Sequence, residues 1–191
     1  LGAPRRLARR NRDALAPYAR AGIPRGGLGP SCLRTLRDEY LEFCPDDDRA
    51  RVVASATRLL EELVLDIGAG RRGAPPPLRG RGRRVLIHNH CHSRALVGAA
   101  PMLEALRSTG AQVEETTAGC CGMAGSFGYE REHYDLSMQI GAMKLFPEVR
   151  AAVRGGAEVV APGFSCRTQV RDGTGVRPMH PAVFLASLLS D

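Results

Sequence analysis

Two adjacent cysteines, Cys120 and Cys121, lie in a glycine-rich turn whose sequence over residues 118–129 is AGCCGMAGSFGY. The thiolate form of cysteine is a strong nucleophile and a soft metal ligand. Consecutive thiolates are awkward ligands for one tetrahedral ion, because both must point at it from neighbouring residues. They suit a multi-iron cluster better, because each can bind a different iron. A strained disulfide between the two is a weaker interpretation.

The glycines of this turn also have two interpretations. Gly122, Gly125 and Gly128 can let the backbone approach a bulky group and can offer N–H donors to sulfur. They could also cradle a phosphate, but the Walker lysine is absent and the pattern is not G-x-G-x-x-G. We therefore predict that Gly122 and Gly125 contribute to a cofactor site built on thiolates.

Most of the cysteines share one position relative to the predicted strands. Five of the six follow the carboxyl end of a strand: Cys91 after 85–88, Cys120 and Cys121 after 111–116, Cys166 after 158–161, and Cys32 after a poorer strand at 23–28. The carboxyl ends of parallel strands meet at one edge of a sheet, so these thiols should converge. Such soft ligands select zinc or an iron–sulfur cluster. We interpret Cys44 as core filler and leave Cys32 undecided.

Three histidines, His88, His90 and His92, surround Cys91. If the strand continued through them, the histidines would point one way and Cys91 the other. We expect at least one histidine to donate to a thiolate or to the cluster, and the others to be ordinary polar residues.

Helical patterns alternate with the strands in the second half of the chain, at about 93–110, 129–146 and 181–189. The segment 129–146 carries a broad apolar face made of Tyr134, Met138 and Leu145, with Leu136, Ile140 and Met143 beside them. The alternation predicts an α/β fold with a parallel sheet and right-handed crossovers. The first half shows a weaker version, with helices at 6–21, at 31–43 and from Pro45 to near Gly68.

The sequence therefore predicts two related Rossmann-like units with parallel strands, of which the first is incomplete. Residues 71–84, RRGAPPPLRGRGRR, have the composition of a basic linker. The predicted organisation is a partial first repeat at 1–70, this linker, and a second repeat at 85–191.

Composition narrows the class of protein. The net charge is +7, but the arginines are scattered and aromatic residues make up only 5% of the chain, so we exclude nucleic acid as a partner. No apolar run approaches the roughly 18 residues of a membrane span, and no signal peptide is recognisable. We expect a cytoplasmic protein, whose reduced thiols serve metal binding or catalysis.

Three motifs resemble the cysteine-rich CCG domain: HNHCHSRALVG at 88–98, GCCGMAGSFGYE at 119–130 and GFSCRTQ at 163–169. This domain occurs in heterodisulfide reductase, in the iron–sulfur subunit of glycolate oxidase, and in fused FAD-binding and iron–sulfur-binding oxidases of the D-lactate or D-2-hydroxyglutarate dehydrogenase type. PSCLRTLRDEY at 30–40 resembles the end of the domain's first repeat. Relatives often end each repeat in Cys-x-x-Cys, whereas this chain has Gly163 before Cys166.

The resemblance implies that Cys91, Cys120, Cys121 and Cys166 bind an iron–sulfur cluster of the 4Fe–4S type, with Cys32 contributing from the first repeat. It implies that FAD, on another domain or subunit, takes electrons from a 2-hydroxy acid such as D-lactate. A quinone or a cytochrome would be the electron acceptor. We expect a C-terminal fragment that is inactive alone and is cytoplasmic, with a peripheral position at the inner face of the membrane as the alternative.

Two rival functions use the same cysteines. A zinc ion bound by the four thiols would make this a structural or interaction domain. A metal-free Cys120–Cys121 pair would instead make it a thiol redox enzyme.

Overall fold

The computed structural model describes residues 2–74 and 76–189 and divides the chain into two compact units, Leu1–Leu63 and Val64–Asp191. Residues 1, 75, 190 and 191, which belong to the predicted repeats and linker, lie outside the described residues. Both units combine helices with short parallel strands, so the predicted α/β fold is confirmed. The assignment of these units to two repeats joined by a linker stays a prediction.

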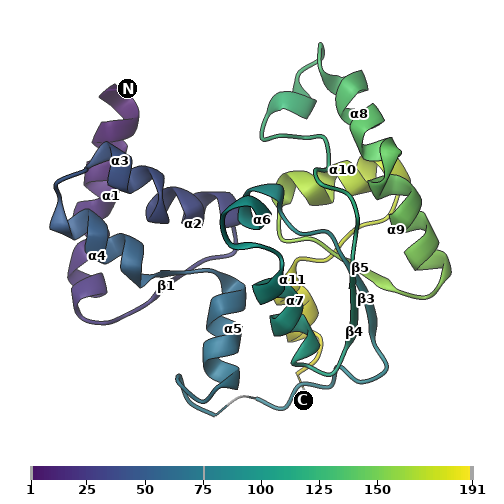
Figure 1. Cartoon of the computed structure of the whole chain (residues 1–191), viewed down its shortest axis with the longest axis horizontal. Coiled ribbons are helices and arrows are strands. Elements are labelled where there is room, and N and C mark those ends of the chain that lie inside the picture. Colours follow the sequence, from purple (N-terminus) through teal and green to yellow (C-terminus); the bar gives the residue numbers. More distant parts are fainter. Residues whose placement is uncertain (1, 75, 190–191) are drawn as a thin grey trace. The chain divides into compact units, whose positions relative to one another are not determined.

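The second unit is built on a parallel sheet of three strands in the order β4-β3-β5 (Figure 1). β3 (Arg84–Ile87) lies between β4 (Gln112–Glu115) and β5 (Glu158–Val160). Val85 is in register with Val113 on one side and Glu158 on the other. The three strands predicted in this half of the chain are therefore confirmed.

Successive side chains along these strands point to opposite faces of the sheet, and each face packs into a separate hydrophobic core. Leu86 and Val159 face a core that includes Leu145, Phe146 and Val149 of α9 (Leu145–Arg154). Val85 and Val160 face another core, with Leu106 of α7 (Ala100–Arg107) and Phe184 of α11 (Pro181–Ala186). Helices thus cover both faces of the sheet, which leaves its carboxyl edge open for a site.

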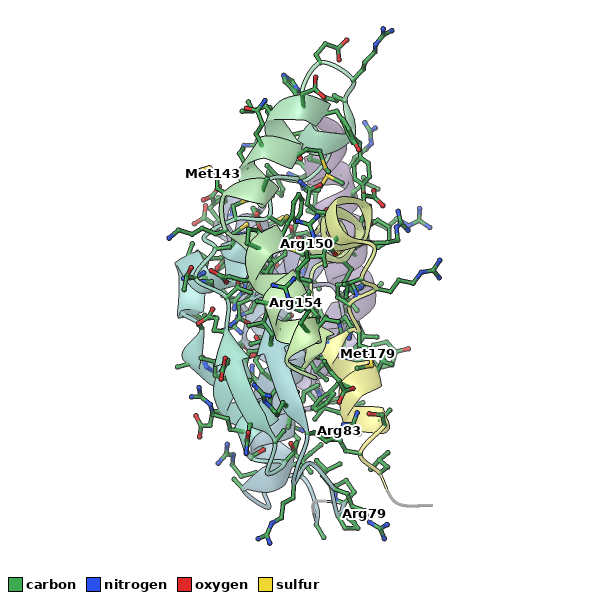
Figure 2. All side chains as sticks on the ribbon, turned by 90° about the vertical axis from the view of Figure 1, so that its right-hand side faces the viewer. Arg79, Arg83, Met143, Arg150, Arg154 and Met179 are labelled. Atoms are coloured by element: carbon green, nitrogen blue, oxygen red, sulfur yellow. The ribbon has the colours of Figure 1, made fainter. Side chains whose placement is uncertain are left out.

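The helix predicted over 129–146 is interrupted, and that prediction is wrong. A short 3₁₀ turn (Phe127–Tyr129) precedes α8 (Tyr134–Met143), and the backbone leaves the helical conformation at Lys144 before α9 begins. The break lets Leu145 and Phe146 turn into the core, and Met138 of α8 packs against the same core, so only part of the predicted apolar face stays in solvent. Tyr134, Leu136 and Met143 are all exposed, and Met143 projects from α8 in Figure 2.

The predicted linker is attached to the second unit from Leu78 onward. The amide of Arg79 donates to the carbonyl of Leu188, and that of Gly80 donates to Thr109. Arg83 forms a bidentate ion pair with Glu158 of β5.

In the first unit, α1 (Gly2–Arg20) packs on α4 (Asp48–Ala56) through Ala16, Ala19 and Val53. The single helix predicted from Pro45 to Gly68 is wrong, because Thr57 is extended and its hydroxyl donates to the carbonyl of Val53. The two-residue strand β2 (Thr57–Arg58) therefore precedes α5 (Leu60–Gly68) and pairs in parallel with β1 (Arg25–Gly26). The predicted helix at 31–43 is likewise two helices, α2 (Pro30–Arg37) and α3 (Glu39–Phe43).

No helix among the described residues is long and apolar enough to cross a bilayer.

A candidate metal centre at the carboxyl edge of the sheet

Four cysteines of the second unit lie on the loops that leave the carboxyl edge of the sheet. Cys91 follows β3 and is the first residue of α6 (Cys91–Val97). Cys120 and Cys121 follow β4, and Cys166 follows β5 in the first turn of α10 (Phe164–Thr174). Since the three strands run in parallel, the loops start from the same edge.

Each of the four thiols influences the pKa of its neighbour, from Cys91 to Cys120, from Cys120 to Cys121, and from Cys121 to Cys166. The hydrogen bonds from Cys121 and Cys91 lower the pKa of Cys120, and the one from Cys121 lowers the pKa of Cys166 well below its ordinary value. The same interactions raise the pKa of Cys91 and Cys121. Each of these thiols donates the hydrogen bond, and it would lose that hydrogen bond if it gave up its proton. The site therefore favours thiolates at Cys120 and Cys166.

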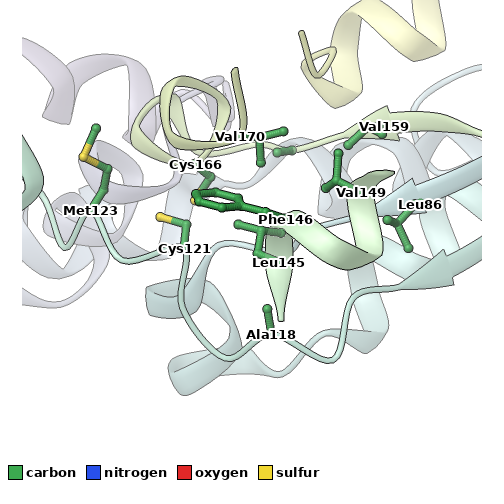
Figure 3. Close-up of a cluster of buried hydrophobic side chains, with 11 residues drawn as sticks. Leu86, Ala118, Cys121, Met123, Leu145, Phe146, Val149, Val159, Cys166 and Val170 are labelled. Atoms are coloured by element: carbon green, nitrogen blue, oxygen red, sulfur yellow. The ribbon is translucent and has the colours of Figure 1, made fainter. Parts of the chain in front are cut away.

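The thiols differ in burial. Cys121 and Cys166 are buried, whereas Cys91 and Cys120 are half-buried, and all four are free of disulfides. Figure 3 shows the Cys121 and Cys166 side chains beside the ring of Phe146, at one end of the apolar core. The centre thus has a dry side toward the core and a wetter side toward solvent.

The loop that holds the adjacent cysteines rests on α8. The amide of Gly122 donates to Cys120 Sγ at 3.4 Å, as expected of an N–H donor to sulfur. Gly122 has φ +98°, and a Cβ there would lie 2.3 Å from the carbonyl oxygen of Ser137. The close approach at Gly122 is therefore to α8, and Gln169 holds that same carbonyl with a hydrogen bond of 2.8 Å. Gly125, at φ +73°, has open space around it.

One histidine lies inside the thiol cluster. His88 is only 1% exposed, and one of its ring nitrogens, Cys121 Sγ and Cys166 Sγ lie within 4.8 Å of one another. Its Nδ1 is 2.8 Å from the hydroxyl of Thr116, just past the end of the neighbouring strand. Sequence reasoning did not single out Thr116, although the parallel register of β3 and β4 places it opposite His88.

The predicted alternation of His88, His90 and His92 against Cys91 is wrong. β3 ends at Ile87, and His90 already caps α6. The His90 ring packs against Gly163, where a Cβ would lie 2.5 Å from His90 Cδ2 and 2.8 Å from Cys166 Sγ. A side chain at position 163, where relatives often carry a further cysteine, would therefore require the His90 ring and Cys166 Sγ to shift.

The two remaining cysteines belong to the first unit. Cys32 lies in the first turn of α2 and is exposed, and its contribution to a metal site stays a prediction. Cys44 is buried at the end of α3, as expected of a small core residue.

These residues fit a soft metal centre. Thiols on loops from three parallel strands supply the ligands that zinc and iron–sulfur clusters select, and Cys121 and Cys166 lie within 4.8 Å of each other and of a ring nitrogen of the buried His88. Gly119 and Gly125 on either side of the adjacent cysteines are exposed, whereas Gly122 and Gly128 are buried.

Comparison with known proteins places these motifs among dehydrogenases. No family model matches the chain. One component of the anaerobic glycerol-3-phosphate dehydrogenase of Escherichia coli (strain K12), its C subunit, is 32% identical over 173 residues, which are 88% of this chain and 41% of that protein. The D-2-hydroxyglutarate dehydrogenase of Pantoea ananatis is 30% identical over 192 residues, or 96% of this chain and 17% of the relative. That of Escherichia coli (strain K12) is 29% identical over 188 residues.

The chain thus spans less than half the length of these relatives. Its similarity to part of D-2-hydroxyglutarate dehydrogenases agrees with the resemblance seen in the motifs. The similarity to a glycerol-3-phosphate dehydrogenase was not expected from the motifs.

Proposed function

We propose that this chain is the iron–sulfur electron-transfer region of an FAD-linked dehydrogenase that oxidises a 2-hydroxy acid. Cys91, Cys120, Cys121 and Cys166 would hold the cluster. The observation that carries the proposal is the convergence of these four thiols at the carboxyl edge of the sheet, where ligand atoms of Cys121, Cys166 and His88 lie within 4.8 Å of one another.

A bound iron–sulfur cluster would supply one-electron storage, and the protein would set its surroundings. The amide of Gly122 donates to Cys120 Sγ, and such N–H donors to ligating sulfur raise a cluster's potential by stabilising the reduced, more negative state. Phe146 and the buried side of the core exclude water near Cys121 and Cys166. The half-buried Cys91 and Cys120 would lie on the side that faces an electron donor or acceptor.

The substrate and partners follow from the relatives and from the resemblance. The relatives' names include a D-2-hydroxyglutarate dehydrogenase and a glycerol-3-phosphate dehydrogenase, whose named substrates are small anionic alcohols. We assign the flavin chemistry to a domain or subunit outside this chain, and propose a quinone or a cytochrome as the acceptor. The site would work in the reducing cytoplasm, where the thiols stay available to metal.

The test is metal analysis of the chain purified without oxygen. We expect iron and acid-labile sulfide in stoichiometric amounts, with visible absorption that bleaches on reduction. Cys166→Ser should lose most of the iron, because Cys166 is buried and its Sγ lies within 4.8 Å of Cys121 Sγ. Cys44→Ser is the matched control, since this buried thiol belongs to the other unit and should leave the iron content unchanged.

A zinc site is the second candidate, and it has its own observation. His88, Cys121 and Cys166 already lie close enough for one ion with little rearrangement. One equivalent of zinc with neither iron nor sulfide would refute the electron-transfer function and support a structural domain.

A further inference from the structure

We propose that Nε2 of His88 is a direct ligand of the metal centre, which would give the centre mixed thiolate and imidazole ligation. The inference rests on the proposed metal centre and adds a donor that is not a cysteine. It starts from the position of His88, which follows β3 directly and is 1% exposed, whereas His90 and His92 are only partly buried.

The opposite side of the ring is held in place. Thr116 Oγ1 lies 2.8 Å from His88 Nδ1, and the amide of Thr116 donates to the carbonyl of Ile87. The two residues are thus fixed side by side on adjacent strands. When the hydroxyl oxygen accepts a hydrogen bond from the Nδ1–H group, Nε2 carries a lone pair that can bind a metal. This is the usual arrangement of metal-ligating histidines.

The free side of the ring faces the thiols. Nε2 is buried and makes no hydrogen bond of normal distance and angle among the described residues, and a looser contact joins the His88 ring to Cys166. Since Nδ1 is engaged by Thr116, Nε2 is the nitrogen available to the group in which His88, Cys121 and Cys166 offer ligand atoms within 4.8 Å of one another. Ligand atoms around one tetrahedral zinc or iron are about 3.5–4 Å apart, so a small inward shift completes the site.

Charge favours a neutral donor at this position. Cys121 and Cys166 are buried beside apolar side chains, where further negative charge is costly. An imidazole adds a donor without adding charge. A cysteine at position 163 would need the His90 ring and Cys166 Sγ to shift, since an added Cβ would lie 2.5 Å from His90 Cδ2 and 2.8 Å from Cys166 Sγ.

The experiment reads the ligand atoms directly in the full chain. The wild-type protein is labelled with ¹⁵N-histidine and purified without oxygen. X-ray absorption at the edge of the metal found then counts nitrogen and sulfur neighbours, and pulsed electron paramagnetic resonance of the reduced iron form detects a directly coupled nitrogen. We expect one nitrogen ligand in the wild type, its complete loss in His88→Ala, and its retention in His90→Ala and His92→Ala.

Each outcome decides between the two proposals. Iron with sulfur ligands only would leave the electron-transfer function standing and overturn the ligation by His88. Zinc with one nitrogen ligand would support the ligation by His88 and overturn the electron-transfer function. A nitrogen signal lost in His90→Ala instead would also overturn the assignment, and absence of any metal would overturn both. If His88→Ala fails to fold, the wild-type spectra and the two neighbouring variants still give the answer.

Discussion

Gly122→Ala should be much more damaging than Gly125→Ala, although both glycines have positive φ and lie in the same loop. An alanine at positive φ costs about 1–2 kcal/mol in either place. At Gly122 the added Cβ would also lie 2.3 Å from the backbone oxygen of Ser137, which cannot move without α8. At Gly125 no atom lies within 4 Å of the added Cβ.

The extra cost at Gly122 is that of overpacking, about 1–3 kcal/mol. The displaced Ser137 carbonyl also accepts the Gln169 hydrogen bond, so the clash reaches α10. We therefore expect Gly122→Ala to lower the free energy of unfolding by about 2–5 kcal/mol, and Gly125→Ala by about 1–2 kcal/mol. Because the Gly122 amide donates to Cys120 Sγ, the first variant should also retain less metal.

The assay is urea unfolding followed by far-UV circular dichroism, on metal-free protein and again after metal loading. The shift in midpoint multiplied by the slope gives the change in free energy. Equal destabilisation of the two variants would refute the argument, because it would mean that α8 does not confine the loop at Gly122.

Three further predictions concern the core, the first unit and the metal. Phe146→Ala should cost about 3–5 kcal/mol in urea unfolding, because the ring is 3% exposed and fills the space beside Gly141 and Gly173; a loss below about 1 kcal/mol would contradict this packing. Burial raises the pKa of Glu61 above its ordinary value of 4.5. The protonated carboxyl therefore stabilises the fold fully below pH 4.5, and this contribution is lost as the pH rises from there through the raised pKa of the folded state. Melting temperatures should therefore fall relative to Glu61→Gln as pH increases, and parallel curves for the two proteins would argue against the shift. Removal of the metal with a chelator should lower the melting temperature, because the bound group links loops from three strands; an unchanged melting temperature would place the metal elsewhere.

Much of the second unit could be predicted from the sequence, because its signals are local. β-branched runs such as Val85–Ile87 form strands wherever a core covers them, and the cysteines follow those strands directly in the chain. The convergence of the thiols needed only the rule that parallel strands share a carboxyl edge. Helix ends were harder, since the break at Lys144 and the short strand at Thr57 depend on contacts that periodicity does not record.

The sequence alone determined the α/β class and named the candidate soft ligands, because residue type and spacing along the chain are enough for both. Only the tertiary structure decided which histidine enters the cluster, since His88, His90 and His92 are chemically alike and differ in burial and partners. It also decided that Gly122 is confined by α8, and that Tyr134, Leu136 and Met143 remain in solvent. Those properties depend on atoms brought together from distant parts of the chain, and no local pattern contains them.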